Sequence, residues 1–284
     1  MENYQTNDLS RLAPVTVCDI SVVIPVKNNA IGLEALLESF LNLHITGHVP
    51  SEIWIVDNGS IEPLANMDFP NKFDLPINLL FCKEPGAGAA RNMGVEASSG
   101  SWVLFIDSDC VVTTTTITGY LSAGSDCIAY TGIIETPING GITRYHELQQ
   151  TFTPPFQDQP EYVVTANCLV NREVFKKLGG FSNTYKTAAG EDVDLGYRLR
   201  TEGKIGVSNS RVLHLLEDNF LHFVERFFRY GRASYYLVQS YGDHFKPVSN
   251  RIKHADVSMR FLAWAQFQTE RVGYHFEMFI GRLL

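Results

Sequence analysis

Residues 102–109 read Trp-Val-Leu-Phe-Ile-Asp-Ser-Asp, which is five apolar residues followed by two carboxylates that flank one serine. An apolar run of this length without polar alternation is typical of a strand buried on both faces of a parallel sheet. Carboxylate oxygens suit hard divalent cations, which commonly bridge protein carboxylates and substrate phosphates. The stretch therefore predicts a buried strand that ends at a metal site near Asp107 and Asp109. A solvated acidic turn is the alternative interpretation of these two carboxylates.

The sequence before this stretch alternates between strand-like and helix-like segments. We expect strands at 21–26, 52–56 and 77–82, and helices at 31–43 and 89–97. Such alternation predicts parallel strands joined by right-handed crossovers, and sheets of this kind bind ligands beyond the carboxyl ends of their strands. Asn28, Asp57 and Asp107 all follow the end of a predicted strand. The site is therefore expected at this edge of an α/β sheet.

The pattern becomes less regular after residue 110. We expect a strand at 127–134, a long and partly ordered excursion at 137–161, and renewed regular patterning at 163–167. Helices are predicted at 172–178, where Gly179 and Gly180 would end the first, at 193–202, and over most of the chain from residue 220 onward. The expected organisation is an N-terminal tail at 1–19, an α/β catalytic domain at 20–217 and a helical extension at 218–284 that packs on it.

Composition excludes several functional classes. The net charge of −8 argues against nucleic acid as a partner, since such proteins usually carry a basic excess. The five cysteines are scattered and lack the close spacing of zinc sites or of a disulfide framework. The polar first ten residues do not resemble a signal peptide, and no apolar run is long enough to span a membrane. We therefore expect a cytoplasmic protein.

Five further residues could carry chemistry, and most of them have a structural alternative. Asp57 could accept hydrogen bonds from a base or a ribose, but Asp-Asn-Gly-Ser is also good turn chemistry. Arg91 follows a loop of small residues and could reach a phosphate, although the loop is neither a P-loop nor a dinucleotide fingerprint. Glu191 and Asp192 open a helix, where they could cap it or supply a general base. His214 is either structural or the completion of a metal site that the carboxylates begin.

Taken together, these segments resemble the family 2 glycosyltransferases. The similar pieces stand in the order of that family at residues 21–28, 55–60, 88–94, 104–109, 165–167, 179–181 and 190–195, and the resemblance covers roughly residues 20–215. It implies a GT-A fold, which is a Rossmann-like, mostly parallel sheet flanked by helices, here with the helical C-terminal extension. It also implies an inverting transfer of a sugar from a UDP- or GDP-sugar donor to an acceptor hydroxyl.

The resemblance assigns roles to residues of this chain. It implies that Asp109 is the main ligand of Mn²⁺ or Mg²⁺, that Asp107 lies near ribose and metal, and that His214 is a further ligand. It implies that Asp192 is the catalytic base, with Glu191 beside it. The nucleotide would be bound by Pro25, Asn28, Asp57, Arg91 and Asp107. Two departures are Asn58, where the family often has an acidic residue, and Cys110, which replaces a frequent acidic residue after the metal triplet.

Partners and alternatives remain open at this stage. The acceptor could be a saccharide, a lipid-linked compound or a small molecule. The aromatic and arginine-rich stretch 220–232 could pack on the catalytic domain or contact the inner face of a membrane, and the helix at 259–284 is a candidate homodimer surface. The alternative functions are a non-catalytic protein that binds a sugar nucleotide or a glycan, and a nucleotidyltransferase. The latter is disfavoured because its glycine-rich loop is missing after the first strand.

Overall fold

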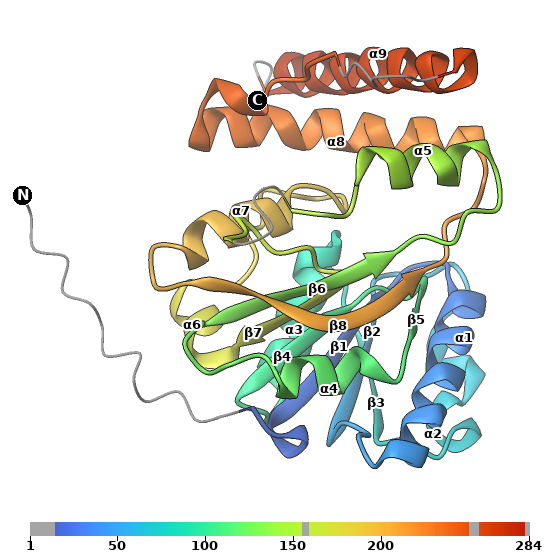
Figure 1. The fold of residues 1–284 in the computed structure, drawn as a ribbon, viewed down its shortest axis with the longest axis vertical. Coiled ribbons are helices and arrows are strands. Elements are labelled where there is room, and N and C mark those ends of the chain that lie inside the picture. Colours follow the sequence, from blue (N-terminus) through green and yellow to red (C-terminus); the bar gives the residue numbers. More distant parts are fainter. Residues whose placement is uncertain (1–14, 155–158, 250–255, 282–284) are drawn as a thin grey trace, which may run out of the picture.

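The structure is a computed structural model that describes residues 15–154, 159–249 and 256–281. In this part of the chain eight strands form one sheet, in the order β3-β2-β1-β4-β7-β6-β8-β5 (Figure 1). The strands are β1 (Ile20–Val26), β2 (Glu52–Asp57), β3 (Ile77–Phe81), β4 (Trp102–Ile106), β5 (Cys110–Val112), β6 (Ala129–Glu135), β7 (Asn167–Asn171) and β8 (Ile205–His214).

The first four strands are parallel to one another, and they carry the sheet edge at which the site was predicted. Strand β1 pairs with β2 on one side and with β4 on the other, and β3 extends the sheet beyond β2. Strand β7 is antiparallel to both β4 and β6, whereas β8 runs parallel to β6 and antiparallel to the short β5. The prediction of a mostly parallel sheet flanked by helices is confirmed.

Helices cover both faces of the sheet. They are α1 (Ala30–Leu41), α2 (Phe69–Lys72), α3 (Ala87–Ala97), α4 (Thr115–Leu121), α5 (Gly141–Gln149), α6 (Arg172–Lys177), α7 (Glu191–Leu199), α8 (Phe220–Tyr241) and α9 (Val257–Ile280). A short 3-10 turn, Asp243–Phe245, lies between the last two helices.

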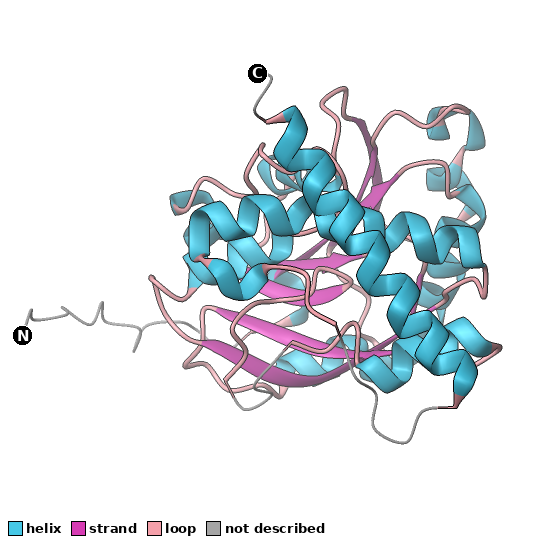
Figure 2. Cartoon of the chain, turned by 90° about the horizontal axis from the view of Figure 1, so that it is seen from above, coloured by secondary structure: helices cyan, strands magenta, loops and turns pink. Residues whose placement is uncertain are grey.

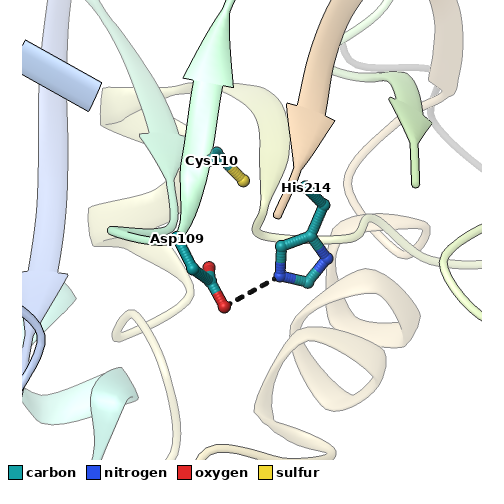
Figure 3. Close-up of side chains that lie close together, drawn as sticks. All are labelled: Asp109, Cys110 and His214. Carbon is teal, nitrogen blue, oxygen red and sulfur yellow. Dashed lines mark ion pairs between the residues drawn. The ribbon is translucent and has the colours of Figure 1, made fainter. Parts of the chain in front are cut away.

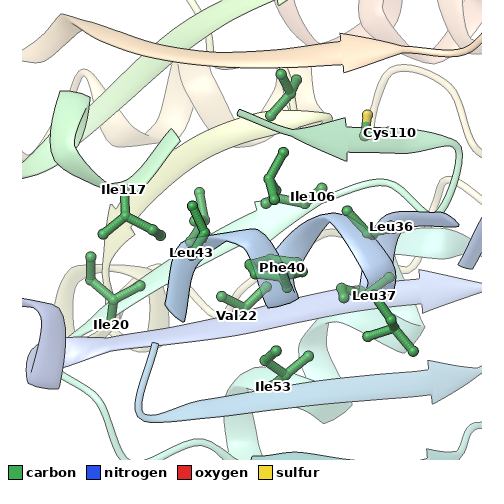
Figure 4. Close-up of a cluster of buried hydrophobic side chains, with 14 of the residues drawn as sticks. Ile20, Val22, Leu36, Leu37, Phe40, Leu43, Ile53, Ile106, Cys110 and Ile117 are labelled. Atoms are coloured by element: carbon green, nitrogen blue, oxygen red, sulfur yellow. The ribbon is translucent and has the colours of Figure 1, made fainter. Parts of the chain in front are cut away.

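The apolar strands are buried on both sides, as their lack of alternation indicates. On one face, Leu104 and Ile106 join a cluster that includes Leu36, Leu37 and Phe40 of α1 (Figure 4). On the other face, Val103 and Phe105 pack against residues of α6 and α7, with the Phe105 ring 5.6 Å from that of Phe175. Successive residues of one strand thus serve two separate cores, because side chains alternate across a sheet.

Helix α5 lies within the expected partly ordered excursion at 137–161, where no helix was predicted. Its N-terminal N–H groups, those of Ile142 and Thr143, donate to the carboxylate of Asp218 at 2.6 and 3.0 Å. The residue that caps this helix is therefore about 75 positions away in sequence. Local patterning cannot reveal such a cap. Residues 155–158 of the segment lie outside the described residues.

Three further boundaries differ from the expectation. Strand β7 begins at Asn167, so the apolar residues at 163–166 precede the strand rather than forming it. Helix α7 begins at Glu191, which makes both acidic residues part of its first turn, and it ends at Leu199. Strand β8 was not predicted, because three of its buried positions are the polar residues Ser208, Ser210 and His214, so its sequence shows no apolar alternation.

Helices α8 and α9 form a layer above one end of the sheet, with α9 outermost (Figures 1 and 2). They approach closely at two glycines, since a Cβ at Gly231 or Gly273 would overlap the backbone of the neighbouring helix. Phe223 and Phe227 of α8 share one apolar cluster with Ile142 and Tyr145 of α5 and with the first half of α9. None of the described helices is both long and apolar enough to cross a bilayer.

Candidate functional site

A cavity of about 2220 Å³ opens at the carboxyl ends of β1, β2 and β4. Its opposite side is formed by α5, α8, α9 and the segment 186–193. Apart from Asp57, every site residue predicted from the sequence contributes to its lining: Pro25, Asn28, Arg91, Asp107, Asp109, Glu191, Asp192 and His214. Residues from five separate segments of the chain therefore face one volume.

Asp57 is occupied by its own turn. Its two carboxylate oxygens accept hydrogen bonds from the backbone N–H groups of Ser60 (2.8 Å) and Leu64 (3.1 Å), and the residue is 3% exposed. The neighbouring Asn58 reaches the cavity instead and joins two loops, because it donates to the Glu84 carbonyl at 2.7 Å and accepts from the Gly86 N–H at 3.0 Å. In this structure the Asp57 carboxylate therefore stabilises the turn after β2, which is the structural alternative considered from the sequence.

The turn after β1 holds the first nucleotide-binding candidates. Asn28 has a positive φ of 55°, a conformation that asparagine tolerates better than most residues. Its side chain accepts from the Ile61 N–H at 2.8 Å, and its backbone N–H donates to Ser60 Oγ at 3.0 Å. These contacts join the turns after β1 and β2, so that Pro25 and Asn28 line the cavity beside Asn58.

Arg91 lies buried between two carboxylates. Its guanidinium contacts Asp107 Oδ1 at 2.6 Å and Glu191 Oε1 at 2.9 Å, while its own side chain is 3% exposed. Burial lowers the pKa of Arg91, but Asp107 and Glu191 raise it further, so the net shift is upward and the charge is permanent. The ion pairs connect the end of β4 to the start of α7, which places Asp192 relative to the rest of the site.

Asp192 directly follows Glu191 in the sequence and also lines the cavity. Burial, followed by the charge of Glu191, raises the pKa of Asp192 to about 7, although Arg91 lowers it. A carboxylate with a pKa near neutrality can accept a proton and release it again at physiological pH. Asp192 lies in the first turn of α7. Gly190 is the N-cap of this helix, and its φ of 81° is a conformation that favours glycine.

Asp109 and His214 meet because the short strand β5 pairs with the end of β8 in a particular register (Figure 3). Strand β5 begins at Cys110, which pairs with His214 at the end of β8. The residue before Cys110 therefore lies beside the imidazole, and His214 Nε2 is 3.0 Å from Asp109 Oδ2. Burial raises the pKa of Asp109, but His214 and Arg226 lower it more strongly, to about 2.

The donor atoms of Asp109, Cys110 and His214 lie within 4.8 Å of one another and could hold a metal ion. Burial raises the pKa of the Cys110 thiol well above its usual range, and its Sγ donates to the Ala166 carbonyl at 3.7 Å. Hard cations such as Mn²⁺ and Mg²⁺ prefer oxygen ligands to this sulfur. The carboxylate and the imidazole suit a divalent cation, and the imidazole Nδ1 is buried without a hydrogen-bond partner among the described residues. The donor set thus fits a metal through Asp109 and His214. Asp107 is instead paired with Arg91.

Two residues near His214 were not identified from the sequence. Phe152 packs edge-on against the His214 ring at 4.6 Å, and Arg226 of α8 lies over the Phe152 ring at 5.4 Å. Arg226 makes no ion pair of 4 Å or less with a carboxylate in the described part of the chain, and it lines the cavity. Arg226 belongs to the aromatic and arginine-rich stretch 220–232, which was identified from the sequence. Phe152 lies in a segment without a recognisable motif.

The chain is similar to known proteins both in sequence and in fold. A family model described as glycosyl transferase family 2 matches residues 21–179. The chain is 30% identical over 201 residues to pre-mycofactocin glycosyltransferase of Mycobacterium tuberculosis, an alignment that covers 65% of this chain and 40% of that protein. It is 29% identical over 198 residues to glycosyltransferase AglE of Haloferax volcanii, which covers 63% of each. The chain thus spans less than two thirds of the length of these relatives.

Two solved structures share the fold. One is GalNAc-T7 with UDP, GalNAc and Mn²⁺, with a TM-score of 0.57 and 16% identity, covering 90% of this chain and 57% of that chain. The other is S. aureus TarS 1-349 in complex with UDP-GlcNAc, with a TM-score of 0.55 and 14% identity, covering 89% of this chain and 74% of that chain. At these low sequence identities, the similarity shows that the backbone fold is shared.

Proposed function

The chain belongs to glycosyl transferase family 2 and has the GT-A fold, and from this membership we propose that it transfers a sugar from a nucleotide-diphosphate sugar to an acceptor hydroxyl. The transfer would invert the anomeric centre and would need a divalent cation, Mn²⁺ or Mg²⁺. The observation that carries the proposal is the placement of Asp192, with its pKa of about 7, on the same cavity as the Asp109–His214 pair.

The donor would occupy the side of the cavity formed by the ends of β1, β2 and β4. Pro25, Asn28 and Asn58 line that side, and Asp109 and His214 would hold the cation near the diphosphate. The cation would neutralise the diphosphate and stabilise it as a leaving group. Arg226, which lies near Asp109, would add a positive charge from the opposite wall. The solved structures that share the fold contain UDP with Mn²⁺ in one case and UDP-GlcNAc in the other.

The acceptor would enter from the side of the helices. Asp192 accepts the proton of the acceptor hydroxyl while that oxygen forms a bond to the anomeric carbon. The bond between this carbon and the diphosphate oxygen breaks with the electron pair staying on the diphosphate, and a single displacement inverts the centre. Arg91 holds Glu191 and Asp107 in place through its two ion pairs while the displacement takes place. Asp192 later releases its proton to solvent.

Thermal unfolding with UDP, GDP, CDP and dTDP, each with and without Mn²⁺, tests the donor site. A nucleotide at a hundred times its dissociation constant stabilises the folded chain by about 2.7 kcal/mol. We expect one nucleotide to raise the unfolding temperature only with metal, and we expect Asp109→Ala and His214→Ala to abolish the shift. Cys110→Ser is the matched control, which should keep the shift because a hard cation prefers oxygen ligands to this sulfur.

The outcomes separate the proposal from a protein that only binds. No shift with any nucleotide, or a shift that Asp109→Ala leaves unchanged, would contradict the donor site. A metal-dependent shift without release of nucleotide from any activated sugar, even to water, would instead favour a non-catalytic binding protein.

A further inference from the structure

Two polar side chains of α9, Gln266 and Glu270, face the cavity. Residues 257–280 are all described, and these two alone among them line it. They are one helical turn apart, so they lie on the same side of α9. The backbone of α9 comes close to α8 at this point, since a Cβ at Gly231 would overlap the backbone of Glu270. The proposed transfer uses neither side chain.

A chain of hydrogen bonds orients this pair. The Gln266 side-chain nitrogen donates to Glu270 Oε1 at 2.9 Å, and the buried Tyr145 hydroxyl of α5 donates to Gln266 Oε1 at 2.5 Å. An ionised carboxylate only accepts hydrogen bonds, so the Gln266 amide must direct its nitrogen toward Glu270 and its oxygen toward Tyr145. The orientation of Gln266 is therefore determined from both ends.

Glu270 has no positively charged partner in the part of the chain that the structure describes. Gln266 is its one side-chain hydrogen-bond partner there. Burial raises the pKa of Glu270 to about 7, although the hydrogen bond from Gln266 lowers it. Taking a carboxylate out of water without a charged partner costs free energy, and a ligand that donates a hydrogen bond to it offsets part of that cost.

The pair presents a hydrogen-bond donor and an acceptor side by side. The second N–H of Gln266 and the second oxygen of Glu270 are the groups that the chain of hydrogen bonds leaves over, and both belong to side chains that line the cavity. A hydroxyl group donates and accepts at once, whereas an ammonium group only donates. Neighbouring hydroxyls of a sugar ring therefore match this pair better than a cation does.

The cavity is large enough for two ligands. Its volume is about 2220 Å³, whereas pockets for one small molecule measure about 300–1,000 Å³. The donor would occupy the side formed by the ends of β1, β2 and β4, so the side of α5, α8 and α9 remains for the acceptor.

We propose that Gln266 and Glu270 form an acceptor subsite and that the acceptor is a saccharide, of which two neighbouring hydroxyls bind to this pair. Tyr145 is a positioning residue, because it acts on the acceptor only through the orientation of Gln266. The inference rests on the proposed function, since it assigns the second substrate of that reaction.

Saturation-transfer NMR tests the subsite without turnover. The full chain, with Mn²⁺ and the nucleotide that raises its unfolding temperature, is titrated with the methyl glycosides of glucose, galactose, mannose and N-acetylglucosamine. Hexanol and hexylamine are the comparison ligands, with one hydroxyl and one ammonium group. We expect a glycoside to bind, and we expect Glu270→Gln and Gln266→Leu each to weaken its binding about tenfold or more. Gln268→Leu, on the same helix but outside the cavity lining, is the matched control.

The kinetics of transfer separate a positioning role from a structural one. With the activated sugar that releases nucleotide, Glu270→Gln and Gln266→Leu should raise the KM of the acceptor about tenfold. Tyr145→Phe should raise this KM in the parent chain but not further in Gln266→Leu, because residues that act through one another are not additive. A merely structural Tyr145 would change the unfolding temperature in both backgrounds and leave the KM of the acceptor unchanged.

The remaining outcomes overturn the inference at different levels. If both variants keep the glycoside affinity, or if no glycoside binds although the nucleotide shift is present, the subsite is wrong and the donor site stands. Binding of hexylamine that Glu270→Gln abolishes would assign the pair to a cation instead. Absence of any nucleotide shift removes the proposed function, and the inference with it. Unfolding temperatures of the variants show that they remain folded.

Discussion

Arg91, Asp107 and Glu191 form the most buried ionic group of the site. Sequence reasoning interpreted Arg91 as a contact to the nucleotide, yet both of its terminal nitrogens contact carboxylates. An arginine fork can hold two acidic groups at fixed distances. In this structure its main task is to connect the end of β4 to the first turn of α7, and so to position Asp192.

Arg91→Met removes the positive charge and keeps much of the side-chain volume. It leaves Glu191 (5% exposed) and Asp107 (30% exposed) without their partner, and breaking a buried pair in this way costs about 3–5 kcal/mol of unfolding free energy. Denaturant unfolding measures the loss. Arg200→Met, at an exposed arginine, is the control and should change stability little. A variant as stable as the parent would show that the pairs do not hold the site together.

Asp192 should control the pH dependence of transfer. Because its pKa is raised to about 7, the base is protonated below that pH, and kcat/KM should fall as the pH drops through 7 and level off above it. Asp192→Asn should lower kcat by about a hundredfold or more while nucleotide binding persists. Asp126→Asn, at an exposed position, is the control. A rate that does not change between about pH 6 and pH 8 would contradict this role.

Among the elements, α5 and the loop after it connect the catalytic side of the sheet to the helical layer. Asp218 caps α5, Tyr145 of α5 donates to Gln266 of α9 at 2.5 Å, and Phe152 of the loop contacts His214. The segment therefore holds a candidate metal ligand from the side opposite to Asp109. Its sequence is poor in apolar periodicity because its contacts are made by a few large side chains.

Phe152→Ala should weaken metal binding without touching a ligand. The His214 ring loses its edge-on partner and can turn away from Asp109, and supporting residues of this kind change metal affinity by about 10–100-fold. The Mn²⁺ concentration that gives half of the nucleotide-dependent thermal shift measures the effect. Leu148→Ala, which is exposed on α5, is the control. An unchanged Mn²⁺ requirement would mean that Asp109 and β8 alone orient His214.

At the scale of the whole molecule, the sheet and the helical layer share one cavity and one apolar cluster. The expected boundary at residues 217 and 218 falls between them, but Ile142 and Tyr145 on one side contact the cluster formed by Phe223, Phe227 and Met259 on the other. Seventeen of the 62 residues that line the cavity also come from beyond that boundary. These contacts indicate that the two parts depend on each other.

A chain cut after Glu217 should therefore lose cooperative unfolding. The cut exposes the apolar side of α5 and removes Asp218, whose loss as a cap alone costs about 1 kcal/mol. Circular dichroism during denaturant unfolding checks this, with the full chain as the reference. A sharp transition in the shortened chain, at the denaturant concentration of the full chain, would establish 20–217 as an independent domain.

The sequence alone determined the parallel half of the sheet and the edge that bears the site. Strand and helix periodicity is a local property, so the runs ending at Val26, Asp57 and Ile106 could be identified without any knowledge of their neighbours. The polar residues after these strands followed from the same patterns, and so did the candidate base at the start of α7. The order of motifs along the chain was also enough to place it in its family.

Only the tertiary structure decided which of these residues meet. The register of Cys110 with His214 brings a histidine to Asp109 from about 100 positions away, and Asp218 begins a helix that no local pattern predicts. Along α9 the sequence shows a mixture of acids and bases, and packing against α8 turns the acids inward and leaves the cations outside. Such contacts depend on how distant segments pack. Periodicity along the chain therefore specified the elements, whereas packing between them assembled the site.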